Sequence, residues 1–280
     1  MSTELSISKE KPLLYTKDRL LRLYGLDLFA AFSSAAMVSP FIAIVDRSII
    51  ENLNGKRQLT DGLKYGLRSF LSNPFQFTVS PQFRIVLGLY FSTYTTANLV
   101  ETTCENYSVD PVKTSLYKFI TTSITNIGLC VYKDKVFARM FGVTASRALP
   151  KLSYFLFAAR DSLTIAASFT APPYIASWLQ QTASFSQKSS QVAAQLACPA
   201  IVQLASTPVH LYALDIYNRP GATIANRTFL IRKEYLKSTL ARIGRIGPAF
   251  VLVVLAIRLL EVTDHVYKLF NRIFFALLHL

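Results

Sequence analysis

Six apolar stretches, each interrupted by small polar residues or proline, alternate with short polar connections along the chain. They lie near residues 26–45, 83–100, 114–132, 152–178, 192–217 and 246–261. Most reach the roughly 17–25 residues that a helix needs to cross the hydrocarbon core of a bilayer. Ser, Thr, Gly and Pro within apolar helices are typical of helices that pack on one another or line a polar cavity. The pattern predicts an all-α membrane protein with six transmembrane helices.

The connections between these stretches alternate in charge. The first, third and fifth connections are basic, whereas the 101–113 connection is acidic and the 179–191 connection is almost uncharged. Because Lys and Arg in short loops orient membrane helices, we expect the three basic connections on one face of the membrane. Six spans then place both termini on the opposite face.

Composition favours a membrane protein over a soluble one. Charged residues make up 16% of the chain and the mean hydropathy is +0.33, whereas a soluble domain carries about 25% charged residues. A soluble protein with six buried helices is the alternative, but it leaves the charge alternation without a cause. The net charge of +14 lies mainly in the basic connections. We therefore expect membrane lipids as partners rather than nucleic acid.

Little in the sequence suggests catalysis. The three cysteines and three histidines show no metal-ligand spacing. Nothing resembles a phosphate-binding loop, a nucleotide-binding fold or a nucleophile triad. We expect no enzymatic activity, no cofactor and no metal. We also expect no cleaved targeting segment, because residues 1–24 are polar and mixed in charge.

A weak internal repeat can be aligned along the chain. Breaks in the first, third and fifth stretches fall at Pro40, Asn126 and Pro208, and we expect these positions to kink their helices. The other three stretches follow Pro81, Pro150 and Pro248. Each unit reads as a long helix, a short basic amphipathic helix and a second long helix. The predicted parts of the chain are a polar segment 1–24 and repeats 25–108, 109–185 (shortened) and 186–280.

Three such units resemble the mitochondrial carrier family. The segment KDKVFARMFGVTASRALP (residues 133–150) follows the family pattern between an odd and an even helix, and RIGRIGPAFVLV (residues 242–253) looks like the start of its sixth helix. The resemblance implies three pseudo-symmetric two-helix repeats around a central cavity. It also implies a monomeric, multi-pass transporter of the mitochondrial inner membrane that moves a small solute by alternating access.

The charged ring that closes the family's cavity is missing from its usual positions. Those positions hold Ile42 and Val45, Gly128 and Val131, and His210 and Ala213. Charged residues follow shortly after each helix break. Each residue of separation from the usual ring position rotates the side chain by about 100° around the helix. They could form a displaced gate: Asp46, Arg47, Lys133, Asp134 and Asp215.

Two sets of residues are candidates for solute binding. The resemblance implies contacts at Thr78, Arg147 and Arg245, which would suit a carboxylate or phosphate, although the two arginines could instead anchor the helices at the membrane surface. Arg160 and Arg258 lie inside apolar stretches, each ten residues after a repeat proline. They could form structural ion pairs with an adjacent or neighbouring acid, or they could bind an anion in the cavity.

Two functions follow from this pattern. The first is a carrier that moves a small anionic solute across the inner membrane. The second is a non-transporting scaffold, import factor or insertase that keeps the same fold, in the inner or outer mitochondrial membrane. The missing charged ring favours the second, and the arginines within or beside the spans favour the first.

Overall fold

The structure, a computed structural model, describes residues 13–142 and 148–244 of the chain. Its elements are α1 (Lys17–Leu53), α2 (Leu59–Ser72), α3 (Pro74–Thr78), α4 (Pro81–Asn106), α5 (Pro111–Phe141), α6 (Lys151–Ile165), the π-helical turn η1 (Ala166–Thr170), α7 (Ala171–Ala183), α8 (Gln187–Asn218) and α9 (Ile224–Gly244). The described residues contain no strand, which confirms the all-α class. The sixth apolar stretch, 246–261, lies outside them, so six spans in three related repeats are not established.

Each of the first five apolar stretches lies within a helix or a continuous helical segment. The helices begin where local chemistry satisfies their free backbone N–H groups. Ser80 accepts a hydrogen bond from the N–H of Phe83 at the start of α4. Asp110 accepts from the N–H groups of Val112 and Lys113 at the start of α5. Pro81 and Pro111 occupy the first position of these two helices, where a missing N–H costs nothing.

Helix breaks are less sharp than the repeat pattern suggests. Pro40 lies inside α1, Pro208 lies inside α8, and both helices continue through them. Asn126 lies within α5. The fourth stretch is divided differently: α6 passes through η1 into α7, just before Pro172. A π-turn widens the helix where proline removes a backbone donor. That the three break positions lie at equal depth in the membrane stays a prediction.

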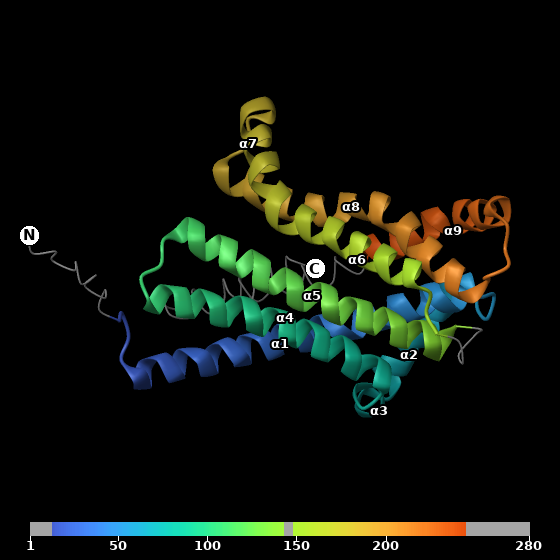
Figure 1. Cartoon of the computed structure of the whole chain (residues 1–280), viewed down its shortest axis with the longest axis horizontal. Coiled ribbons are helices and arrows are strands. Elements are labelled where there is room, and N and C mark those ends of the chain that lie inside the picture. Colours follow the sequence, from blue (N-terminus) through green and yellow to red (C-terminus); the bar gives the residue numbers. More distant parts are fainter. Residues whose placement is uncertain (1–12, 143–147, 245–280) are drawn as a thin grey trace, which may run out of the picture.

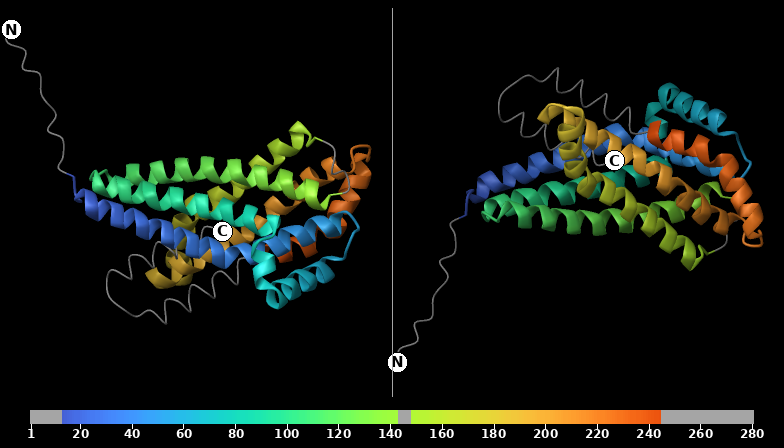
Figure 2. Two further views of the ribbon diagram at one scale, coloured as in Figure 1. Left: turned by 90° about the horizontal axis from the view of Figure 1, so that it is seen from below. Right: turned by 90° about the horizontal axis from the view of Figure 1, so that it is seen from above.

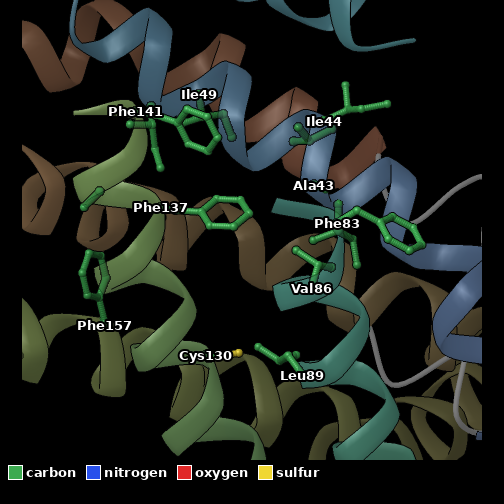
Figure 3. Packing of buried hydrophobic residues seen from close by; sticks show 14 of the residues in the cluster. Ala43, Ile44, Ile49, Phe83, Val86, Leu89, Cys130, Phe137, Phe141 and Phe157 are labelled. Atoms are coloured by element: carbon green, nitrogen blue, oxygen red, sulfur yellow. The ribbon is translucent and has the colours of Figure 1, made fainter. Parts of the chain in front are cut away.

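The long helices form an elongated bundle (Figure 1). α1 packs on α4, α4 packs on α5, and α6 pairs with α8, while α5 and α6 join the two groups. The main apolar core lies between these five helices. Phe137 and Phe141 of α5 meet edge to face with ring centroids 5.5 Å apart, and Figure 3 shows Phe141 beside Ile49 of α1. Large apolar side chains also face outward along the long helices, as in Leu116, Ile120 and Ile124 of α5.

Two described helices are long and apolar enough to cross a membrane, judged by length and composition. They are α1 and the Ser189–Asn218 part of α8. Outward-facing apolar side chains on the other long helices fit the same environment, because a protein in water rarely exposes so much apolar surface. A membrane-spanning protein therefore fits the described helices.

Two short amphipathic or basic helices, α2 and α9, lie at the same end of the bundle (Figure 2). α2 approaches α1 closely because two glycines face it. A Cβ on Gly62 would lie 2.9 Å from Ser48 Oγ, and one on Gly66 would lie 2.6 Å from Ile44 Cγ2. Both distances are shorter than ordinary packing allows, so side chains at these positions would push the two helices apart.

The described parts of the three basic connections meet at this end. Lys56, which follows α1, donates from Nζ to the carbonyls of Phe141 and Gly142 at the end of α5, 2.9 Å in each case. Asn52 at the end of α1 donates from Nδ2 to Glu234 Oε2 of α9 at 2.5 Å. These bonds connect the end of α1 to the end of α5 and to α9. That the three basic connections share one face of the membrane stays a prediction.

Candidate functional site

A buried cluster of charged side chains lies where four long helices come together. Its members are Asp46 of α1, Lys133 and Asp134 of α5, Arg160 and Asp161 of α6, and His210 of α8. Each has a relative exposure of 6% or less. Ionisable groups inside membrane helices are costly and persist where they pair with one another or serve a solute. We refer to these six residues as the charge cluster.

Lys133 and Asp134 connect the cluster across helices. Lys133 Nζ binds Asp46 Oδ2 of α1 and lies 3.0 Å from Asp134 Oδ1. The other oxygen of the same carboxylate, Asp134 Oδ2, accepts from Arg160 Nη2 of α6 at 2.7 Å. One carboxylate therefore joins a lysine that reaches α1 to an arginine on α6. Paired charges thus connect α1, α5 and α6.

Arg160 is the most highly connected member. Its Nε and Nη2 donate to Asp161 Oδ1 at 3.0 and 2.5 Å. Its Nη1 lies 2.7 Å from His210 Nδ1 of α8. Because arginine has only donors, His210 Nδ1 must accept, and the imidazole then carries its proton on Nε2 when neutral. The ring of Phe157 packs against both His210 and the guanidinium group.

Within the described residues, one carboxylate oxygen of the cluster has no hydrogen-bond donor. Asp161 Oδ1 accepts twice from Arg160, but Asp161 Oδ2 is buried and accepts no hydrogen bond. A buried carboxylate oxygen without a donor is strongly unfavourable. The fold therefore keeps an acceptor that a solute ammonium or N–H could satisfy.

A polar stripe on α5 leads away from the cluster. Thr122, Asn126, Cys130 and Asp134 are four residues apart in succession, so they lie along one side of the helix. Cys130 Sγ lies 3.6 Å from Asn126 Oδ1, and Asn126 Nδ2 lies 3.4 Å from Thr93 Oγ1 of α4. Thr122 Oγ1 is buried and has no hydrogen-bond partner among the described residues. The stripe offers neutral hydrogen-bonding groups over about 18 Å of helix.

The structure brings together one part of the residues expected from the sequence. Three expected gate residues, Asp46, Lys133 and Asp134, share the cluster with Arg160, which was expected to bind solute or form an ion pair. Arg160 does pair with Asp161, the adjacent acid, and also with an acid on a neighbouring helix. Three of the gate candidates and one of the binding candidates therefore belong to a single group.

Other expected residues lie elsewhere. Arg47 pairs with Glu51 at 2.7 Å and lies over the rings of Tyr65 and Phe141. Asp215 binds Arg219 and Arg227 at the far end of α8, both at 2.6 Å. Thr78 ends the short helix α3, where its hydroxyl donates to the carbonyl of Phe75. The structure thus gives these three residues local partners outside the cluster.

The remaining expected binding residues, Arg147, Arg245 and Arg258, lie outside the described residues. The sequence analysis did not identify His210 or Asp161 as site residues. Both could have been identified in the same way as Arg160, because each is an ionisable side chain inside an apolar stretch. Within the described ranges, no group of His, Cys, Asp and Glu has the arrangement of a metal site.

Comparison with known proteins changes the family assignment. A family model described as "Probable citrulline exporter" matches residues 30–253, and no model of the mitochondrial carriers matches. No match was found among curated proteins or among solved structures. The resemblance to mitochondrial carriers is therefore wrong. It rested on a succession of long and amphipathic helices that different membrane families can share, while the charges specific to the carriers are absent from residues 42, 45, 128, 131, 210 and 213.

The mitochondrial location rested on the same resemblance, and the family match does not support it. Transport of a small solute and a position among membrane lipids agree with the family description. Because the match spans residues 30–253 of a chain of 280, this protein belongs to the family described as probable citrulline exporters.

Proposed function

We propose that this protein exports a small zwitterionic amino acid across a membrane, with citrulline as the first candidate, and that the charge cluster binds its charged end. The family description supplies the class of solute. The observation that carries the assignment to this site is the free, buried Oδ2 of Asp161. An α-ammonium group provides the donors that this oxygen lacks. The sequence predicted a small anionic solute. The proposal replaces it by a solute that carries both an ammonium group and a carboxylate.

Arg160 is the matching group for the solute carboxylate. It now donates to Asp134, Asp161 and His210. When a solute ammonium takes over Asp161, one or two guanidinium N–H groups become available for the solute carboxylate, which an arginine binds in a planar, two-point geometry. The exchange replaces an internal ion pair by two pairs with the solute. Because the protein loses one of its own pairs when the solute binds, the net gain is smaller than two pairs and the solute can also leave.

The polar stripe suits the other end of the solute. Citrulline carries a neutral side-chain group that both donates and accepts hydrogen bonds. Asn126 lies about two helical turns from Asp134 along α5 and is partly exposed. Its amide can pair with such a group without adding charge. A solute with a cationic side chain would lack a carboxylate partner there, which gives a basis for selection against dibasic amino acids.

Movement between two states requires the cluster to open. The Lys133–Asp46 pair joins α5 to α1, and the Arg160–Asp134 pair joins α6 to α5. Either pair can hold the helices together while the solute is absent and separate when the solute supplies new partners. Such exchange of interface ion pairs is an established way to couple binding to helix motion.

Efflux from proteoliposomes tests the proposal. Purified protein is reconstituted into vesicles loaded with labelled citrulline, and efflux is compared with that of ornithine, arginine and leucine. We expect saturable citrulline efflux that falls at least tenfold in Asp161→Asn, which keeps one acceptor for Arg160 but loses the charge. Asp61→Asn, which removes an exposed acid on α2, is the matched control and should transport normally.

Two results would reject parts of the proposal. Normal efflux by Asp161→Asn would leave transport in place but move the binding site away from the cluster. No efflux of any of the four amino acids, from vesicles whose protein is shown to be folded, would favour the non-transporting scaffold instead.

A further inference from the structure

α9 has its polar and apolar sides reversed relative to a helix of a soluble protein. Toward the bundle it buries Arg227, Glu234, Ser238, Thr239 and Arg242. Outward it exposes Phe229 (71%), Leu236 (62%) and Leu240 (59%). A soluble protein would bury the second set and expose the first. The outward-facing apolar residues of α9 therefore require an apolar environment beside them.

Specific partners fix this orientation. Arg227 Nη1 donates to Asp215 Oδ2 of α8 at 2.6 Å, and its Nη2 donates to the carbonyl of Arg219 at 2.6 Å. Glu234 accepts from Asn52 of α1, and Arg242 Nε donates to Gln203 Oε1 of α8 at 2.9 Å. Rotating α9 would break all of these bonds at once. The outward position of the apolar residues is thus built into the fold.

Cations border the apolar side chains on both sides. At about 100° per residue, Phe229, Leu236 and Leu240 lie within roughly 40° of one another around the helix. Arg232 lies about 60° to one side of Phe229, and Lys233 and Lys237 lie about 40° and 80° to the other. All three cations are exposed, and Glu234, the one acidic residue of α9, is buried. No charge on the outer side of α9 therefore offsets the three cations.

A similar pattern occurs on α2, at the same end of the bundle (Figure 2). Leu67 and Leu71 are exposed there beside the exposed cations Lys64 and Arg68. Asn52 connects the two helices, because its Oδ1 accepts from the N–H of Leu59 at the start of α2 while its Nδ2 donates to Glu234. Both helices therefore present an apolar side with flanking cations to the surroundings.

We propose that the outer face of α9 binds anionic phospholipids, with Arg232, Lys233 and Lys237 contacting the headgroup phosphates. Phe229, Leu236 and Leu240 enter the acyl-chain region beside them. A helix lying in the membrane interface combines these two contributions, and the electrostatic part requires negatively charged lipid. Since α9 is bonded to α1 and α8, lipid bound to its outer face stabilises the junction of the long helices. The inference does not depend on the identity of the transported solute.

Thermal stability in neutral detergent measures this binding. Phosphatidylglycerol is titrated into the full-length protein, with phosphatidylcholine and inorganic phosphate as comparison additions. We expect phosphatidylglycerol alone to raise the unfolding temperature. In the triple variant Arg232→Gln, Lys233→Gln, Lys237→Gln, the lipid concentration giving half the effect should rise by roughly 10- to 100-fold, since each cation contributes about fivefold near a charged membrane surface.

The matched control removes three exposed cations from the other end of the bundle, at Lys17, Arg22 and Lys113. It changes the net charge equally and should respond to phosphatidylglycerol as the unaltered protein does. Equal weakening in both variants would show a nonspecific charge effect and overturn the proposal. A second result would also overturn the proposal: a dimer of the unaltered protein in neutral lipid that becomes a monomer in the α9 variant. The outer face of α9 would then be an interface between two copies.

A second measurement needs no variant. Phosphatidylglycerol carrying a photoreactive group in its acyl chain is added to the unaltered protein, and the modified peptides are located by mass spectrometry. We expect enrichment of label on the 229–240 part of α9 over the exposed apolar side of α5. Even labelling of all lipid-facing helices would contradict a dedicated site.

Discussion

Lys133 of α5 forms a buried ion pair with Asp46 of α1, although 87 residues separate them in the chain. Each side chain has 6% or less of its surface exposed. Two charges removed from water in this way depend on each other. Loss of one leaves the other buried without its partner, whereas replacing both by apolar groups of similar size does not.

The first prediction is a double-mutant cycle on this pair. Lys133→Met and Asp46→Leu should each lower the free energy of unfolding by about 3–5 kcal/mol, because each removes one side of a buried ion pair. The double variant should recover at least half of the summed loss. Unfolding in detergent, followed by circular dichroism, measures the cycle. Additive losses in the double variant would show that the two residues do not interact.

The second prediction concerns the close packing of α2 on α1. Gly66→Ala should destabilise the protein, because the added Cβ meets Ile44 Cγ2 at 2.6 Å and a β-branched side chain has little room to move. Gly88→Ala on α4 is the control, since nothing lies within 4 Å of its added Cβ. It should be neutral or stabilising by up to about 1 kcal/mol through helix propensity.

Opposite signs for the two glycine substitutions are the decisive outcome. If Gly66→Ala stabilised the protein as much as Gly88→Ala, the close approach of α2 to α1 would be incorrect.

The third prediction concerns the end of α8. Arg227→Ala should destabilise the protein by about 2–4 kcal/mol, because it removes one partner of buried Asp215 and one of the donors to the carbonyl of Arg219. Arg232→Ala, on the exposed side of the same helix, should change stability by less than about 0.5 kcal/mol in neutral detergent. Chemical denaturation of both variants makes the comparison. Equal effects would argue against a buried role for Arg227.

The fourth prediction tests membrane topology. Single cysteines at Asn54 and Thr223, in a chain whose three native cysteines are replaced, should react from the same side of the membrane. Both positions lie in basic connections at the end of the bundle where α2 and α9 lie. Labelling of intact vesicles with a membrane-impermeant reagent gives the result. Reaction from opposite sides would contradict the predicted orientation.

The sequence was sufficient for much of the helical framework because hydrophobic length and loop composition act locally. The first five apolar stretches are each helical, and the short amphipathic helix expected after the first of them is α2. A basic helix, α9, likewise follows α8. The exact place where the fourth stretch divides, at η1 just before Pro172, depends on how the preceding turn adjusts to the missing backbone donor.

Charge pairing was harder to predict because it depends on the relative rotation of helices that are distant in sequence. The sequence singled out Asp46, Lys133, Asp134 and Arg160 separately, from charges near helix breaks or inside apolar stretches. It could not show that Asp134 accepts from Arg160 while Arg47, next to Asp46, turns toward Glu51. A difference of one residue rotates a side chain by about 100° around the helix. That rotation decides whether the side chain points into the charge cluster or away from it.

The reversed polarity of α9 has a consequence for the order in which the chain assembles. Glu234 meets Asn52 of α1, which was synthesised 182 residues earlier, and Arg242 meets Gln203 of α8. Until α1 and α8 are in position, α9 has no partners for the charges on its inner side and cannot dock. Its docking therefore occurs late and requires earlier helices to be correctly placed. A chain with a misplaced α1 would leave Glu234 without its bond to Asn52, and one with a misplaced α8 would leave Arg242 without its bond to Gln203.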